Sequence, residues 1–224
     1  MSWHYKNNRL SKKRKKDVEE IVIEEGELPN ILEMMGGIED KFSLSGDRVR
    51  RDGNDIYFYT GVKTSSALDL ISAIKNSERE NLTIAMDNKM DEPPKIYLHI
   101  NSLGGSIFDA FSVIDCMISC KVPIVTIIEG CAASAATLIS IVASERIITP
   151  HSQMLIHQLS SAAWGKFSEI EDEYNNLKKF MKMIKDIYKE YTDVKMKTLD
   201  ETLRHDIWWS ADECLRLGLV DRIE

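Results

Sequence analysis

The fold is decided by residues 95–128, which read KIYLHINSLGGSIFDAFSVIDCMISCKVPIVTII. The first part, 95–100, alternates like a strand, with Ile96, Leu98 and Ile100 on one side and Tyr97 and His99 on the other. A turn with two glycines follows, and then an apolar stripe at helical spacing, formed by Ala110, Val113, Ile114, Met117 and Ile118. A second strand is predicted over 122–128. This order predicts a βαβ unit with parallel strands.

The same alternation continues on both sides of this unit. A strand over 56–59 and a helix over 64–77 come before it. After it, we expect a turn that starts at Gly130 and a buried helix over 132–143. The later predicted elements are strands over 146–148 and 153–157, helices from Thr198 and Ser210, and a closing strand over 219–223. We therefore predict an α/β fold with a mainly parallel sheet.

One long amphipathic helix is predicted over 165–194. Its apolar residues recur three or four positions apart: Phe167, Ile170, Tyr174, Leu177, Met181, Ile184 and Tyr188. No segment of matching length follows it. We expect the helix to project and to pack against another subunit, and the alternative is that it covers the sheet of its own chain.

Composition and charge predict one folded domain with a charged arm. The chain has 224 residues, 43% of them hydrophobic, and a net charge of −7, which argues against a nucleic-acid role for the whole chain. Residues 1–16 nevertheless contain seven basic residues and no acidic one. We expect an irregular, solvated arm over 1–50 and a domain over 51–224. The arm could instead be a removable pro-segment, or contact nucleic acid or a partner.

Cysteine usage and hydropathy predict a cytoplasmic protein. Cys116, Cys120, Cys131 and Cys214 form no CxxC pair and have no nearby histidine that completes a zinc pattern, so we expect reduced thiols. No N-terminal stretch resembles a signal peptide. The apolar run 131–144 is too short to span a bilayer.

Three motifs carry candidate chemistry. Ser134 stands among alanines where a predicted strand meets a predicted helix, as a nucleophile on a tight bend does, and the N–H of Ala135 is a candidate oxyanion donor. Gly104 and Gly105 let a second backbone N–H approach a substrate. His157 stands at the end of a predicted strand, a rigid place for a general base. Taken alone, each motif also fits a purely structural role.

The three motifs together resemble the proteolytic-subunit family of the Clp protease (ClpP), in this order: Asn101-Ser102-Leu103-Gly104-Gly105, Gly130-x-Ala132-Ala133-Ser134 and Met154-Leu155-Ile156-His157-Gln158. The resemblance covers residues 55–224 and admits a divergent or phage-type member. It implies a crotonase-like spiral of βαβ units with a long projecting helix. It further implies Ser134 as nucleophile, His157 as base, and the N–H groups of Gly105 and Ala135 as oxyanion hole.

The sequence departs from the family pattern at three places. Leu103 stands where the family usually has proline, and Ala135 stands where a methionine often follows the nucleophile. Neither change removes a backbone donor. In the family an aspartate completes a catalytic triad with the serine and the histidine. An ungapped count back from Ser210 places Thr202, and no aspartate, at that position. Asp206 is the first replacement and Asp200 the second.

The resemblance implies a serine endopeptidase that works without a cofactor on peptides or unfolded proteins. As partners it implies homo-oligomeric rings, expected as two stacked heptamers, and an AAA+ unfoldase, with no membrane and no nucleic acid. One alternative is an acyl-CoA hydratase or isomerase of the crotonase type, which would not need Ser134 with His157. The other is a structural ring or capsid-maturation protein with a decayed site.

Overall fold

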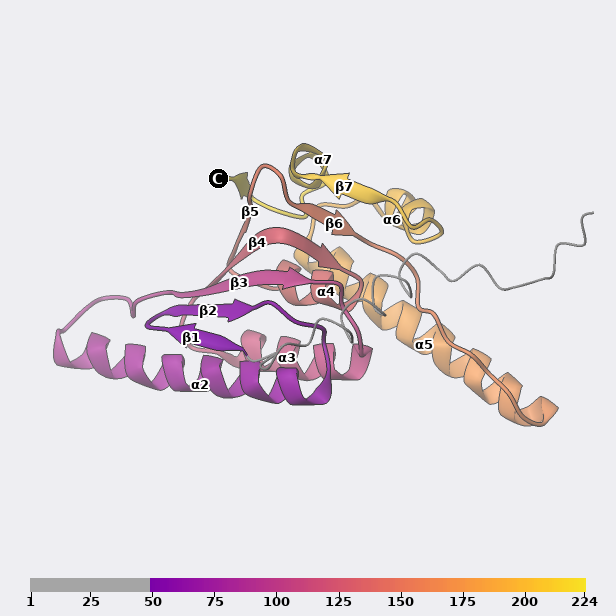
Figure 1. Cartoon of the computed structure of the whole chain (residues 1–224), viewed down its shortest axis with the longest axis horizontal. Helices are drawn as coiled ribbons and strands as arrows, with labels where there is room; N and C mark the ends of the chain where they lie inside the picture. Colours follow the sequence, from indigo (N-terminus) through magenta and orange to yellow (C-terminus); the bar gives the residue numbers. More distant parts are fainter. Residues whose placement is uncertain (1–48) are drawn as a thin grey trace, which may run out of the picture. The chain divides into compact units, whose positions relative to one another are not determined.

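The computed structural model describes residues 49–224, so almost all of the arm expected over 1–50 lies outside the described residues. In the described range, eight strands form one sheet. Its main path runs through β1 (Arg50–Asp52), β2 (Asp55–Phe58), β3 (Ile96–Ser102), β4 (Ile124–Ala133), β5 (Glu145–Ile148) and β8 (Arg222–Ile223) (Figure 1). Two further strands, β6 (Gln153–Leu155) and β7 (Trp208–Ser210), extend from the second half of β4. Only the β1–β2 and β6–β7 pairs are antiparallel, which confirms the predicted α/β fold.

The central strand β4 is long enough to pair with two different neighbours on one side. Its first half, 125–128, pairs with β5, and its last residues, 131–133, pair with β6. Gly130, at a φ of +91°, lies between the two halves, and its N–H donates to Ser152 Oγ at 2.6 Å. The sheet therefore divides here, and the β6 branch lies at the carboxyl end of β4.

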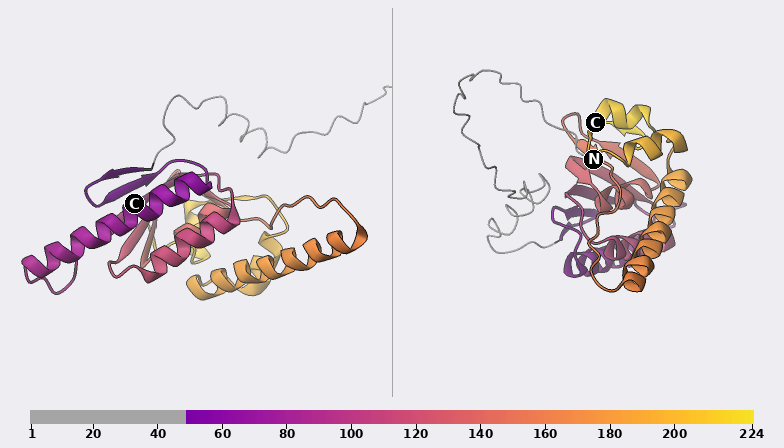
Figure 2. Two further views of the ribbon diagram at one scale, coloured as in Figure 1. Left: turned by 90° about the horizontal axis from the view of Figure 1, so that it is seen from below. Right: turned by 90° about the vertical axis from the view of Figure 1, so that its right-hand side faces the viewer.

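The β3 alternation is confirmed in part by burial, since His99, predicted on the same side as Tyr97, is buried as well. Ile96, Leu98 and Ile100 are completely buried, whereas Tyr97 is exposed. The helices α2 (Thr64–Asp87) and α3 (Ile107–Ser119) lie side by side (Figure 2), and α2 also contacts β2 and β3. In α3 the predicted stripe is buried except for Ile118, which is 51% exposed. Ile118 belongs to the last turn of α3, where it borders a surface groove rather than the core.

Several predicted boundaries are wrong. The helix predicted over 64–77 continues to Asp87, because good helix formers such as Glu78, Arg79 and Glu80 extend it beyond the last buried isoleucine. The strand does not end in a turn at Gly130, as predicted, because β4 runs on to Ala133. Ala132 and Ala133 pair with β6, so the buried helix α4 (Ala135–Ile141) starts three residues later than predicted.

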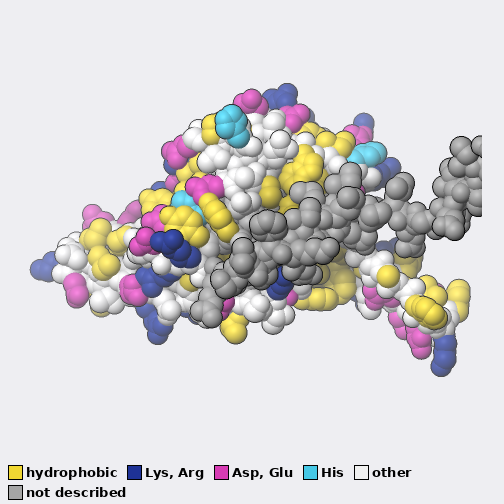
Figure 3. Space-filling model, viewed as in Figure 1, with side chains coloured by type: hydrophobic (Ala, Val, Ile, Leu, Met, Phe, Trp, Pro, Cys, Tyr) yellow, Lys and Arg dark blue, Asp and Glu magenta, His cyan; other side chains and the backbone are white. Residues whose placement is uncertain are grey.

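The long helix α5 (Phe167–Tyr191) is present and projects. Its buried residues are Ile184 and Tyr188, both in the C-terminal half. Its N-terminal half extends away from the sheet (Figure 1), and apolar side chains gather near its tip (Figure 3). Phe167 is 82% exposed and Tyr174 is 58% exposed. The core of the described chain therefore covers only one end of α5.

Two short helices, α6 (Met196–Thr202) and α7 (Ala211–Arg216), precede and follow β7, which pairs antiparallel with β6 although α5 and α6 lie between the two strands in the chain (Figure 1). The closing strand β8 is shorter than the predicted 219–223. Among residues 49–224, no helix combines the length and the hydropathy that crossing a bilayer requires.

Candidate active site

Ser134 forms the bend between β4 and α4. Its backbone has a φ of 54° and a ψ of −125°, a conformation that costs a non-glycine residue about 1–3 kcal/mol unless its surroundings hold it. The surroundings do hold it. The N–H of Ser134 donates to the carbonyl of Leu155 at 2.8 Å, and its carbonyl accepts the N–H of Thr137 at 3.0 Å. Ser134 remains partly exposed between buried alanines, as a nucleophile must.

The glycine turn after β3 packs directly against this bend. Gly104 has a φ of +92°, and a Cβ there would lie 2.7 Å from the Cβ of Ser134 and 2.5 Å from the carbonyl oxygen of Ala133. Such distances exclude every side chain, so only glycine permits this approach. The sequence pattern placed the two glycines near the site, and the structure brings Gly104 into contact with it.

Two backbone N–H groups at this junction are available for an anion. Val62 donates to the Gly104 carbonyl at 2.7 Å and accepts from the Ser106 N–H at 2.8 Å. In such a parallel bridge the middle residue, Gly105, directs its own N–H away from Val62. Ala135 is the first residue of α4, where an N–H has no acceptor within the helix. Both predicted oxyanion donors thus lie on segments that meet at Ser134.

His157 lies outside β6, which ends at Leu155, and not at the end of a strand over 153–157 as predicted. The register Ala133↔Leu155 brings the end of β6 beside Ser134, and His157 stands two residues further on. Its side chain is 12% exposed. Its Nδ1 lies 3.8 Å from Asp206 Oδ1, whereas its Nε2 is buried and has no hydrogen-bond partner in the described chain. A buried ring nitrogen without a partner costs stability, so its presence calls for an explanation such as a catalytic role.

The three candidates for the third position differ in their surroundings. Asp206, in the loop before β7, has a 60% exposed side chain and is the carboxylate beside His157, at a distance too long for a hydrogen bond. Asp200 instead pairs with Lys185 of α5 at 2.6 Å. Thr202 is buried, and its carbonyl accepts the N–H of His205. The described geometry favours Asp206.

A second histidine, His99 of β3, lies outside this site. Its Nδ1 is 3.0 Å from Glu129 and its Nε2 is 3.0 Å from Asp55, and the ring of Tyr57 stacks on it with centroids 4.5 Å apart. Nearby, burial and a hydrogen bond to Glu129 raise the pKa of Tyr59 to about 12. Both nitrogens of His99 are therefore engaged, which suits a structural role.

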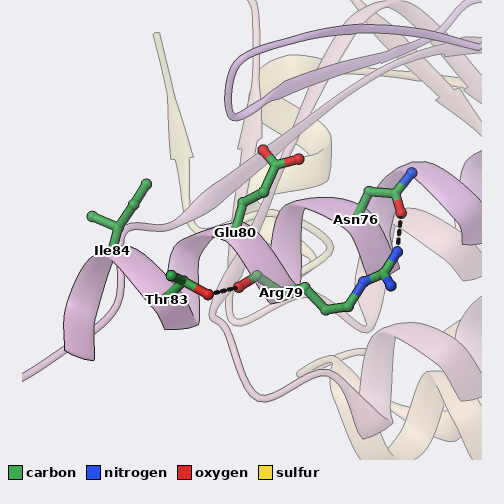
Figure 4. Close-up of a pocket in the computed structure, with 5 residues that line it drawn as sticks. All are labelled: Asn76, Arg79, Glu80, Thr83 and Ile84. Atoms are coloured by element: carbon green, nitrogen blue, oxygen red, sulfur yellow. Dashed lines mark hydrogen bonds between the residues drawn. The ribbon is translucent and has the colours of Figure 1, made fainter. Parts of the chain in front are cut away.

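The structure also has a surface hollow far from Ser134 in the chain. It encloses about 520 Å³ along one face of α2 and is lined by Asn76, Arg79, Glu80, Thr83 and Ile84 (Figure 4). Arg79 reaches back to Asn76, and Thr83 donates to the carbonyl of Arg79. All five lining residues belong to α2, Glu80 pairs with Arg51 of β1, and the set includes neither a nucleophile beside a base nor a histidine.

Two residues near the Ser134 bend were missed by the sequence analysis. Thr137 and Tyr188 form a buried hydrogen-bonded pair behind Ser134. The sequence analysis had Tyr188 only in the apolar stripe of the long helix and Thr137 only within the buried helix predicted over 132–143. The pairing of α4 with α5 that joins them has no signal in sequence spacing.

Comparison with known proteins places this geometry in a family. The family model described as Clp protease matches residues 55–224. The chain is 29% identical over 192 residues to "ATP-dependent Clp protease proteolytic subunit 1" of Chlamydia abortus, with 84% of this chain and 95% of the relative covered. The protein of the same name from Chlamydia trachomatis is 29% identical, with 85% and 94% covered, and that from Protochlamydia amoebophila is 28% identical, with 81% and 86% covered. The chain belongs to the Clp protease family.

Proposed function

We propose that this chain is a serine endopeptidase with Ser134 as nucleophile and His157 as general base. One observation carries the proposal: Ser134 holds a strained bend beside the strand that leads to His157, whose Nε2 is buried without a partner in the described chain. Strained backbone residues cluster at functional sites, and a buried nitrogen without a partner is uncommon enough to call for an explanation such as a catalytic role.

The reaction uses only groups of the chain and a water molecule. Neutral His157 takes the Ser134 proton at Nε2 while Oγ attacks the peptide carbonyl, and a tetrahedral oxyanion forms. The N–H groups of Gly105 and Ala135 donate to that oxyanion, each contributing about 3 kcal/mol to transition-state stabilisation. His157 then protonates the leaving amine, and water, activated by the same imidazole, hydrolyses the acyl-enzyme. Asp206 orients the ring through Nδ1.

For that last role Asp206 has to come closer to His157. Its carboxylate lies 3.8 Å from Nδ1, and a hydrogen bond needs about 2.7–3.2 Å. Hydrogen bonds between catalytic groups are often long in an unliganded enzyme and tighten when substrate binds. The exposed position of Asp206 leaves room for this movement, and contacts within an assembly would hold Asp206 closer to His157.

We further propose that the protein acts as a ring assembly, in two stacked heptamers, on peptides or unfolded proteins delivered by an AAA+ unfoldase in the cytoplasm. The exposed apolar side chains of α5 support an interface with another copy of the chain. The relatives are named as subunits of an ATP-dependent protease, which supports both the assembly and the unfoldase.

The decisive experiment treats the purified protein and its Ser134→Ala variant with a fluorophosphonate probe and a fluorogenic peptide. We expect labelling and hydrolysis by the wild type, and loss of both in the variant by at least about a thousandfold. Alanine fits the same small site, so the melting temperature should stay nearly constant. Undiminished hydrolysis by the variant would refute the assignment, and a wild type that never labels would favour a crotonase-type or structural role.

A further inference from the structure

A buried chain of hydroxyl groups connects the long helix α5 to the bend at Ser134. Thr137, in the first turn of α4, places its Oγ1 2.6 Å from the Ser134 carbonyl oxygen. The same Oγ1 bonds to the phenol of Tyr188, which comes from α5. Thr137 is completely buried and Tyr188 is 2% exposed. Water has no direct access to this chain of groups.

The direction of the hydrogen bonds follows from counting protons. The Ser134 carbonyl has no proton, so Thr137 must donate its single hydroxyl proton to it. Thr137 Oγ1 can then only accept from Tyr188, which must donate. Burial raises the pKa of the Tyr188 phenol, so that its proton remains in place across the working pH range. The chain therefore runs from Tyr188 through Thr137 to the Ser134 carbonyl.

This carbonyl belongs to the peptide unit that matters for catalysis. It accepts two hydrogen bonds, from the N–H of Thr137 at 3.0 Å and from the hydroxyl of Thr137 at 2.6 Å. The same rigid peptide plane carries the N–H of Ala135, because a carbonyl and the following N–H are coplanar and point in opposite directions. Any group that fixes the carbonyl of Ser134 also fixes the direction of the Ala135 N–H.

We propose that Tyr188 is a positioning residue, which aims the Ala135 N–H at the oxyanion by holding the Ser134–Ala135 peptide plane through Thr137. This inference rests on the proposed peptidase function and deepens it. Because Tyr188 belongs to the helix whose other end exposes apolar side chains, the orientation of the donor is tied to the helix that we propose for subunit contact.

The test compares Tyr188→Phe, Thr137→Val and the double variant in the full-length protein. We expect kcat for a fluorogenic peptide, and the rate of fluorophosphonate labelling, to fall about tenfold in each single variant while KM stays within about twofold, since the lost group acts on the transition state. The double variant should be no worse than either single one, because both changes break the same chain of bonds. Thr137→Ser, which keeps the hydroxyl, should restore most of the activity.

Two controls separate positioning from stability and from failure of the proposed function. Tyr191→Phe removes a phenol from the same helix and should leave kcat unchanged. Native mass shows whether Tyr188→Phe still assembles, and if it does not, Thr137→Val provides the kinetic result. Wild-type kcat in assembled Tyr188→Phe and Thr137→Val would overturn the inference while leaving Ser134 chemistry intact. If the wild type itself never reacts with the fluorophosphonate probe, the proposed function fails. In that case, a crystal structure of Tyr188→Phe that retains the Ser134 bend would overturn the inference as well.

Discussion

His99 belongs to β3 and His157 follows β6, and both of these strands pair with β4. Both side chains are almost buried, but their ring nitrogens have different surroundings. His99 has a carboxylate at 3.0 Å from each nitrogen and a tyrosine ring stacked on it. His157 has one carboxylate at 3.8 Å and a buried Nε2 with no partner among the described residues. A fully satisfied histidine stabilises the sheet, whereas one with a nitrogen in reserve can accept a proton. The contacts of the two histidines therefore indicate a structural role for His99 and a chemical role for His157.

The strongest test of this comparison replaces each histidine by glutamine. His157→Gln should reduce kcat/KM by about a thousandfold or more with little change in stability, because it removes the base and no bond of the fold. His99→Gln should keep most of the activity and lower the free energy of unfolding by about 1–3 kcal/mol, because the nearly buried side chain loses one of its two carboxylate contacts. Peptidase kinetics and denaturant unfolding measure both effects. If the two variants exchange these behaviours, the assignment of base and structural histidine is wrong.

The next test concerns the exposed apolar half of α5. Phe167→Glu combined with Tyr174→Glu should yield smaller particles, because charges cannot be buried in a subunit contact without partners. We expect peptidase activity to fall more than about tenfold, with the helical content unchanged, as an active site completed by assembly requires. Analytical ultracentrifugation and circular dichroism provide the readouts. Asn175→Glu adds charge to the same helix at an exposed polar position and serves as control; a fully active monomer would refute the ring model.

A third test asks which carboxylate supports His157. Asp206→Asn should lower kcat about tenfold to a hundredfold or more, since an amide cannot stabilise the imidazolium or hold the same tautomer. Asp200→Asn should change kcat by less than about twofold, because Asp200 pairs with Lys185 on a partly exposed surface. The reverse order of effects, measured by steady-state kinetics, would move the orienting role to Asp200.

The smallest effect is expected at a satisfied ion pair far from Ser134. Arg146 donates to both carboxylate oxygens of Asp221, at 3.1 Å and 2.5 Å, and this bonding holds the pKa of Asp221 below its ordinary value. A lowered pKa in the folded state means that the contribution to stability is complete above the unfolded pKa of about 3.9 and disappears as the pH falls through the folded value. Asp221→Asn should therefore melt a few degrees lower than the wild type at pH 7. The two melting curves should converge below pH ~3; a difference that persists there would exclude this linkage.

Much of the fold could be predicted because it depends on local periodicity. The alternation in β3 and the repeat in α5 mark a buried strand face and an amphipathic helix without knowledge of their neighbours. The same logic failed at Gly130 and at residue 132, where helix-compatible alanines extend β4 instead. Their backbone groups bond to β6, a strand that follows twenty residues later, and no local pattern encodes that pairing.

The sequence by itself determined the candidate nucleophile, the candidate base and the glycine turn, since small residues at a strand–helix junction and a histidine after an apolar strand are visible in the order of residues. Only the tertiary structure decided which carboxylate lies beside His157, which glycine packs against Ser134, and that Tyr188 reaches Thr137. Each of these depends on contacts between segments far apart in the chain. The distances between these segments follow from how the sheet branches and how α5 packs on α4. Neither arrangement can be predicted from the spacing of residues along one element.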